Sequence, residues 1–201
     1  MKNPAPTEYP VNELIRDRWS PRAFADKPIA PADLRSLFEA ARWAPSSSNE
    51  QPWAFIVATR HDKEDFTKAL QPLVEFNVNW AKHAYVVGFA VSQLDFAKNK
   101  TPNRNAQYDT GAAMSQLTTE ATSRGLLVHQ MAGFDPDTAR EVFEIPAGWD
   151  AIAAFAIGYP GDPASLPQPY RARETAPRAR KPIREFVMSG KWGHTADFIS
   201  K

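Results

Sequence analysis

Apolar residues recur at helical spacing in six stretches of the chain. The clearest stretch is 31–43, where apolar residues fall at positions i, i+3, i+4 and i+7 from Leu34 onward. Pro31 stands at its start, where a helix tolerates proline. Similar patterns, with turn residues at their ends, predict helices over 11–18, 62–70, 73–82, 105–124 and 135–143.

Continuous apolar runs, typical of buried β-strands, lie at 53–59, 84–91 and 151–159, and a shorter run predicts a strand at 126–131. The runs at 53–59 and 84–91 are apolar enough for both faces to be buried. The strands alternate with helices, and no repeat or Gly/Ser-rich linker divides the chain. We therefore expect one α+β or α/β domain spanning residues 1–201.

The longest predicted helix, 105–124, carries a stripe of small residues at helical spacing: Gly111, Ser115, Thr118 and Thr122. Small side chains let a second helix approach closely. We therefore expect this helix to lie at the centre of the fold.

Proline is the unusual residue type, with 18 in the chain. Six lie in residues 1–31 and six in residues 160–182. Because proline fixes φ and removes a backbone donor, both ends should be largely extended or irregular. Two irregular ends on a compact middle need a surface to lie against.

Composition excludes several classes of protein. Without cysteine the chain has no disulfide framework, thiolate nucleophile or thiolate metal site. No apolar run approaches the length of a membrane helix, and the N-terminus lacks the apolar region of a signal peptide. These observations favour a cytoplasmic protein that does not bind membranes.

The net charge of +1 indicates no particular partner, but residues 171–191 carry seven Lys/Arg and two Glu. Such a basic segment is commonly a solvated tail. No aromatic stacking platform or known nucleic-acid motif accompanies it, so we do not expect nucleic acid as a partner.

Motifs for nucleotide binding and serine hydrolysis are absent, and the four histidines form no metal-ligand pair. An enzyme of this sequence would therefore rely on a bound cofactor. Three segments suit an anionic, partly aromatic cofactor: R-W-S-P-R at 18–22 (the first motif), A-P-S-S-S-N-E-Q-P-W at 44–53 (the second motif) and R-A-R-K at 178–181. Arginine pairs can grip a phosphate through paired hydrogen bonds. Surface arginines and a plain polar loop explain the same segments when each is taken alone.

Together these segments resemble the FMN-dependent nitroreductase family. The resemblance spans nearly the whole chain and includes F-N-V-N-W-A-K-H-A at 76–84, D-T-G-A-A at 109–113, M-A-G-F-D at 131–135 and I-G-Y-P-G-D at 157–162. It implies an α+β fold with a central mixed, mainly antiparallel sheet flanked by helices. It also implies an intertwined homodimer in which an extended arm, residues 160–201, packs on the partner subunit.

The resemblance further implies FMN at the subunit interface, reduced by NADH or NADPH, which then passes electrons to nitroaromatics, quinones or related small acceptors in a ping-pong cycle. The phosphate and ribityl side of FMN would be held by Arg18, Trp19, Ser20 and Arg22, with Arg178 and Arg180 closing over the phosphate. Arg22 is also the candidate for stabilising negative charge at the pyrimidine end of the flavin. Trp19 would either pack on the ribityl chain or fill the core.

The second motif would reach the flavin from the partner subunit through Pro45, Ser46, Ser47 and Asn49. Asn77 would contact the pyrimidine edge, with Asn79 as the alternative. Backbone donors near the flavin N5 would come from Met131, Ala132 and Gly133. Some relatives place a carboxylate side chain where this sequence has Ala132, so no acid is available there.

Two alternatives stay open. One is a flavin enzyme of the same fold with another acceptor, such as an enone or a halogenated aromatic. The other is a protein that binds FMN without turning it over.

Overall fold

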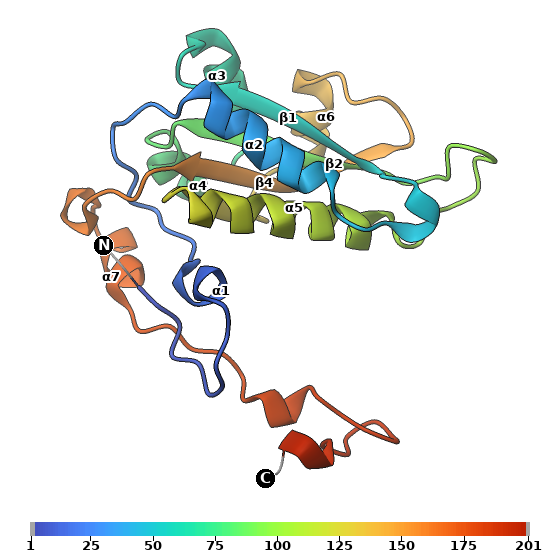
Figure 1. The fold of residues 1–201 in the computed structure, drawn as a ribbon. Helices are drawn as coiled ribbons and strands as arrows, with labels where there is room; N and C mark the ends of the chain where they lie inside the picture. Colours follow the sequence, from blue (N-terminus) through green and yellow to red (C-terminus); the bar gives the residue numbers. More distant parts are fainter. Residues whose placement is uncertain (1–2, 200–201) are drawn as a thin grey trace.

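The computed structural model describes residues 3–199, which are built around a four-stranded sheet (Figure 1). The strands are β1 (Trp53–Thr59), β2 (Val86–Gln93), β3 (Leu127–Met131) and β4 (Trp149–Gly158), in the spatial order β1-β2-β4-β3. Every pairing among them is antiparallel. The expected α+β fold with a mainly antiparallel sheet is confirmed, and the described strands contain no parallel pair.

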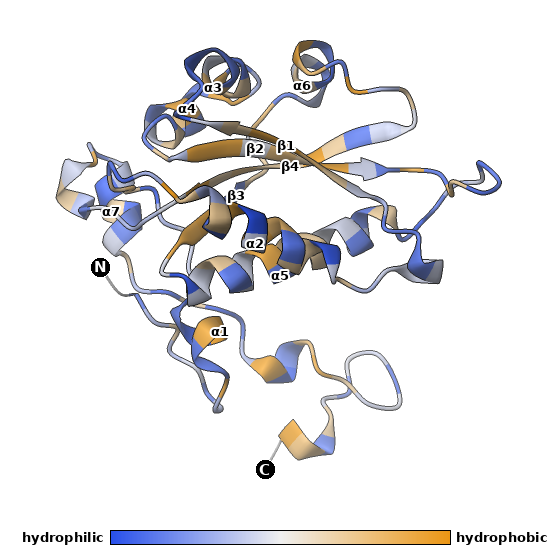
Figure 2. Ribbon diagram, turned by 45° about the horizontal axis from the view of Figure 1, so that its top comes forward, coloured by the Kyte–Doolittle hydropathy of each residue, from blue (hydrophilic) through white to orange (hydrophobic). Residues whose placement is uncertain are grey.

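Helices cover both faces of the sheet. Their bounds are α1 (Glu13–Asp17), α2 (Pro31–Arg42), α3 (Lys63–Leu70), α4 (Glu75–Ala81), α5 (Ala106–Ser123), α6 (Pro136–Val142) and α7 (Tyr170–Thr175). Short 3₁₀ turns lie at Ser47–Asn49, Pro163–Ser165, Ile183–Glu185 and Asp197–Ile199. Helices α2 and α5 lie on one face, and α3, α4 and α6 on the other (Figure 2). Within the described residues, no helix combines the length and apolar content needed to cross a membrane.

Strand β2 shows why the sheet is buried on both faces. Its alternate residues Val87 and Phe89 join the apolar cluster on the α3 and α4 side, whereas Val86 and Ala90 join the cluster on the α2 and α5 side. Side chains alternate between the two faces of a strand, so a continuous apolar run is what a sheet covered on both faces requires.

The predicted helices and strands all form, with ends displaced by no more than two residues. One expectation was wrong: strand β1 is largely half-buried, because it lies at the sheet edge with one neighbouring strand. The proline-rich C-terminal segment is largely irregular, as expected, although the short helix α7 forms within it.

Helix α5 lies against the sheet, but its small residues do not all face inward. Thr118 is buried, whereas Gly111 and Ser115 are exposed, and a Cβ added at Gly111 would meet nothing within 4 Å. The exposed positions of α5 are Gln107, Tyr108, Gly111, Ser115, Gln116 and Ser123, none of them charged. Helices α2 and α1 both pack near α5, but the space at Gly111 stays open within residues 3–199.

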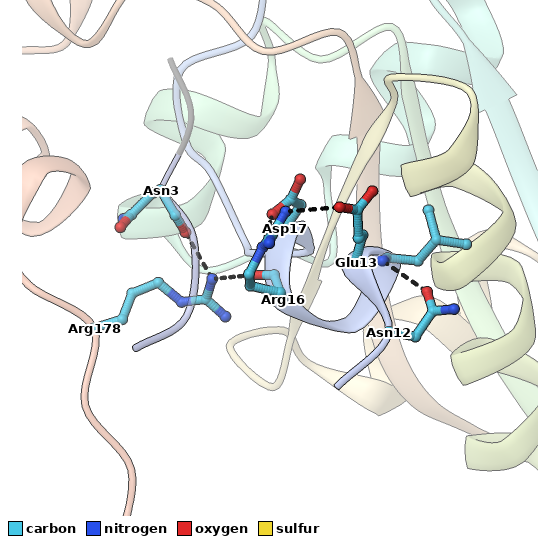
Figure 3. A network of polar contacts seen from close by, with 7 residues as sticks. Asn3, Asn12, Glu13, Arg16, Asp17 and Arg178 are labelled. Carbon is cyan, nitrogen blue, oxygen red and sulfur yellow. Dashed lines mark hydrogen bonds and ion pairs between the residues drawn. The ribbon is translucent and has the colours of Figure 1, made fainter. Parts of the chain in front are cut away.

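The N-terminal segment and the first part of the C-terminal arm lie side by side below the sheet (Figure 1). The Nη1 group of Arg178 donates to the carbonyl oxygens of Asn3 at 2.6 Å and Arg16 at 3.1 Å (Figure 3). The arm expected to pack on a partner thus begins by packing on its own N-terminal segment. Beyond it, Phe186, Trp192 and Phe198 are 60%, 92% and 72% exposed. Residues 200 and 201 of the expected arm lie outside the described residues.

Candidate functional site

Three arginines from the two ends of the chain form a cluster of positive charge. Arg18 follows the last residue of α1, and Arg178 and Arg180 come from the C-terminal arm. Burial lowers the pKa of Arg18, and the charges of Arg178 and Arg180 lower it further. Within residues 3–199 none of the three forms an ion pair with a carboxylate. The cluster therefore has unbalanced positive charge, which favours an anion.

A hollow of about 430 Å³ lies beside this cluster. It is lined by Arg18, Ser20 and Arg180, by Ser115, Thr118 and Thr119 of α5, by Val128 and Gln130 of β3, and by Ile15. Arg18 Nη1 donates to Ser20 Oγ at 3.2 Å, which orients both groups of the first motif. The volume lies within the usual range of small-molecule sites, and hydroxyl, amide and guanidinium groups converge on it.

Arg22 of the first motif is held mainly through its backbone. Its N–H and that of Ala23 donate to the carboxylate of Glu174 on α7. The guanidinium carbon lies 5.9 Å from the centre of the Trp80 ring, and the buried Nε has no hydrogen-bond partner within the described residues. Burial lowers the pKa of Arg22, an effect that the nearby Glu174 carboxylate opposes. An unpartnered buried Nε–H is a donor open to a ligand acceptor.

Two aromatic residues support the same segment. Trp19 is only 7% exposed, which favours a role in packing over ligand contact. His129 of β3 places Nδ1 2.7 Å from the carbonyl oxygen of Pro21. A carbonyl only accepts, so this nitrogen carries the hydrogen. Burial lowers the pKa of His129 to about 4, outweighing the hydrogen bond to Pro21, and the imidazole is neutral near pH 7.

The segment that follows β3 is tied to α4. Asn77 Nδ2 donates to the Gly133 carbonyl at 2.9 Å, and a Cβ at Gly133 would lie 2.6 Å from that nitrogen. Within residues 3–199 the Gly133 N–H donates no hydrogen bond to a protein group. Met131 is buried and Ala132 is exposed. Asn79 instead donates to the Tyr170 hydroxyl at 3.3 Å, so Asn77 is the asparagine that reaches the 131–133 segment.

The second motif forms a separate site at the opposite part of α5. The Ser47 N–H donates to the Asp109 carboxylate at 2.9 Å, and Pro45, Ser46 and Ser47 line a hollow of about 320 Å³ with Tyr108. Asn49 adopts a positive φ of 55° in this turn. Asp109 and Thr118 are nine residues apart on one helix, about 13 Å along its axis. One chain therefore does not bring the second motif to the arginine hollow.

Glu174, Asp109, His129 and Gln130 take part in these sites but were not predicted from the sequence. Asp109 had a weak signal, since it opens the D-T-G-A-A segment at the start of the longest helix. Glu174 had none, because it stands in a segment expected to be irregular.

The chain is similar in sequence and in structure to known proteins of one family. A sequence model of the nitroreductase family matches residues 15–159, a range that includes the first motif, the second motif and the 131–133 segment. A crystal structure described as an oxidoreductase containing FMN has a TM-score of 0.89 and 36% identity to this chain. The alignment covers 95% of this chain and 97% of that one.

Curated relatives carry related names. A candidate NADH dehydrogenase/NAD(P)H nitroreductase of Streptomyces coelicolor is 29% identical over 184 residues, covering 81% of this chain and 90% of that protein. Nitrobenzene nitroreductase of Ectopseudomonas oleovorans is 42% identical over 64 residues, covering 32% of this chain and 28% of that protein. The second similarity therefore concerns less than a third of either chain.

Proposed function

Because the chain belongs to the nitroreductase family, we propose that it is an FMN-dependent NAD(P)H oxidoreductase acting on nitroaromatics, quinones or similar small acceptors. The observation that carries the proposal is the cluster of Arg18, Arg178 and Arg180 beside the 430 Å³ hollow. Three guanidinium groups without carboxylate partners repel one another. A phosphate dianion relieves that repulsion and accepts paired, charge-assisted hydrogen bonds.

The residues present fit FMN as the group to be held. Arg18 and Arg180, which line the hollow, would hold the phosphate, and Arg178 adds positive charge beside them. The hydroxyl and amide groups of Ser20, Thr118 and Gln130 would hold the polyhydroxylated chain. FMN, when bound, supplies the redox chemistry by accepting two electrons from the nicotinamide and delivering them to the acceptor. NADH and NADPH are both retained as candidate donors.

The chain's own groups then bind and orient. Arg22 offers a fixed positive charge and a free Nε–H, which favour negative charge on a neighbouring group. The Gly133 N–H is a free backbone donor at the end of β3, and the Asn77 amide fixes the Gly133 peptide. Ala132 provides no acid. Rate enhancement in such a site comes from positioning first the nicotinamide and then the electron acceptor against the bound flavin, and not from side-chain acid–base chemistry.

Two half-sites in one chain support a homodimer as the active form. The second motif lies too far along α5 to meet the arginine hollow of its own subunit. The uncharged, small-residue face of α5 and the exposed Phe186 and Trp192 of the arm offer surface for a second copy. In such a dimer Pro45, Ser46, Ser47 and Asn49 of one subunit complete the hollow of the other.

The proposal is tested by titrating the purified flavin-free chain with FMN and then measuring NADH- and NADPH-dependent reduction of an acceptor panel. Nitrobenzene, a benzoquinone, an enone and a halogenated phenol distinguish the nitroreductase assignment from enzymes of the same fold with other acceptors. Turnover confined to the enone or the halogenated phenol would replace the acceptor class. Failure to bind FMN would overturn the assignment itself.

A further inference from the structure

Glu174 links the C-terminal arm to the first motif. We propose that it is a positioning residue for the phosphate site: it fixes the backbone of the first motif and the start of the arm in one arrangement, so that Arg18 and Arg180 face the same anion. This inference rests on FMN being the ligand of the arginine hollow.

The Glu174 carboxylate is buried, and hydrogen bonds to the first motif compensate the cost of removing its charge from water. Glu174 is 1% exposed, and its oxygens accept the Arg22 N–H at 2.8 and 3.0 Å and the Ala23 N–H at 3.0 Å. A buried carboxylate is costly unless it is hydrogen-bonded, and here two backbone donors of the first motif satisfy it. The same bonds satisfy two N–H groups that lie outside any helix or strand.

The helix that carries Glu174 is itself fixed to α4. The Tyr170 hydroxyl accepts a hydrogen bond from Asn79, and its ring centre lies 4.6 Å from that of Phe76. The Arg173 guanidinium lies 4.9 Å from the Phe76 ring centre. Because α7 is only six residues long, these contacts and the Glu174 bonds hold it more than its own hydrogen bonds do.

Glu174 lies shortly before the two arginines of the C-terminal arm in the sequence, so the bonds that hold it also influence where those arginines lie. Arg178 and Arg180 follow it by four and six residues, across the extended residues at Ala176 and Pro177. Arg178 then docks on the Asn3 and Arg16 carbonyls, and Arg180 lines the hollow. Loss of the Glu174 bonds thus frees both halves of the phosphate site, although Glu174 does not line the hollow itself.

A purely structural role for Glu174 makes a different prediction. In that case its loss lowers stability and leaves the affinity of the folded protein for FMN unchanged. A positioning role lowers the affinity itself. It also makes the contribution of Arg180 depend on Glu174, because Arg180 is presented to the phosphate only while the arm is seated.

The test uses the full flavin-free chain and follows FMN binding by quenching of flavin fluorescence. For Glu174→Ala we expect the FMN dissociation constant to rise roughly tenfold to a hundredfold, and for Glu174→Gln, which keeps one carbonyl acceptor, roughly threefold to tenfold. Arg180→Ala should cost much less in the Glu174→Ala background than in the native chain, giving a non-additive double-mutant cycle. Amide hydrogen exchange of residues 18–24 in the flavin-free protein should accelerate in both Glu174 variants.

Two controls separate positioning from stability. Phe66→Leu, in the α3 core away from the site, is expected to lower the melting temperature without changing the FMN dissociation constant. Glu185→Ala removes an exposed carboxylate from the same arm and should change neither quantity. Native-like FMN affinity in folded Glu174→Gln and Glu174→Ala, an additive cycle with Arg180→Ala, or unchanged exchange at 18–24 would each overturn the inference. If the native chain fails to bind FMN, the proposed function fails with it, whereas the exchange experiment still reports whether Glu174 holds the first motif.

Discussion

The carboxylate of Glu174 accepts the backbone N–H of Arg22 at 2.8 Å, joining residues 152 positions apart in the sequence. This bond makes the first motif and the C-terminal arm one structural unit, although the first motif precedes all four strands in the sequence and the arm follows them. The candidate phosphate site is therefore closed by tertiary contacts between the two ends. That closure explains why proline-rich segments without regular structure hold a defined position.

Arg18 is expected to contribute the largest single share of anion binding, since it is half-buried, lines the hollow and is oriented by its hydrogen bond to Ser20. Arg18→Ala should raise the FMN dissociation constant roughly tenfold to a hundredfold, the range for losing hydrogen bonds to a charged group. The measurement is a fluorescence titration with FMN. Arg35→Ala, an exposed arginine on α2, is the matched control and should leave the affinity unchanged. Equal affinities for the two variants would contradict the assigned phosphate site.

Arg178 and Arg180 should differ in what their loss does. Arg178 donates to the carbonyl groups of Asn3 and Arg16, so Arg178→Ala should loosen both termini and increase cleavage by trypsin within residues 176–191. Arg180 lines the hollow, so Arg180→Ala should weaken FMN binding roughly tenfold and leave cleavage nearly unchanged. The double variant should still fold. Unchanged FMN affinity in the double variant would make the arm a solvated tail.

The exposed face of α5 is expected to meet a second subunit. Gly111→Leu has free space in the single chain, so the subunit should still fold. Across a close helix interface the larger side chain should raise the dimer dissociation constant roughly tenfold or more, since overpacking costs about 1–3 kcal/mol. Analytical ultracentrifugation measures the change. Because the proposed dimer takes the second motif of each site from the partner subunit, FMN affinity should fall in parallel.

Thr67→Leu, at an exposed position of α3, is the control for that substitution and should leave the dimer intact. A Gly111→Leu protein that remains fully dimeric with native FMN affinity would show that this face of α5 is not the interface.

His129 should make stability fall in acid. Burial lowers its folded-state pKa to about 4 from an ordinary 6.5. Between these values the unfolded chain is protonated and the folded chain is not, so the contribution is complete above pH 6.5 and declines as the pH falls towards 4. The decline should approach roughly 3 kcal/mol. Urea unfolding between pH 4 and 7 measures it, and His129→Gln should flatten the curve. His61→Gln, at an exposed site, should keep the native pH dependence; equal curves for native and His129→Gln proteins would refute the assignment.

Hydrophobic patterning predicted α2 and β2 well because the buried residues of each element form a pattern within its own sequence. In α2 they recur at helical spacing, and in β2 they form a continuous apolar run. It failed at α7, whose buried positions Tyr170 and Glu174 include a charged residue. That helix depends on Phe76, Asn79 and the first motif, and none of these contacts leaves a local pattern.

The small-residue stripe shows a different limit. Gly111 and Ser115 predicted a face that a second helix approaches, and in this chain both residues are exposed. Spacing alone cannot say whether a helix of the same chain or of a second subunit would meet that face. The sequence likewise identified Asn77 and Asn79 as candidates but could not decide which of them reaches the 131–133 segment. Only the path of α4 turns Asn77 towards Gly133 and Asn79 towards Tyr170.

The central claim is that this chain holds FMN and uses it to accept electrons from a nicotinamide. The most direct measurement is the visible spectrum of the FMN-reconstituted protein, recorded without oxygen before and after addition of NADH or NADPH. We expect flavin absorbance that bleaches with at least one of the two nucleotides and returns when a nitroaromatic or quinone is added. A colourless protein that cannot be reconstituted with FMN, or a yellow one that neither nucleotide bleaches, would contradict the claim.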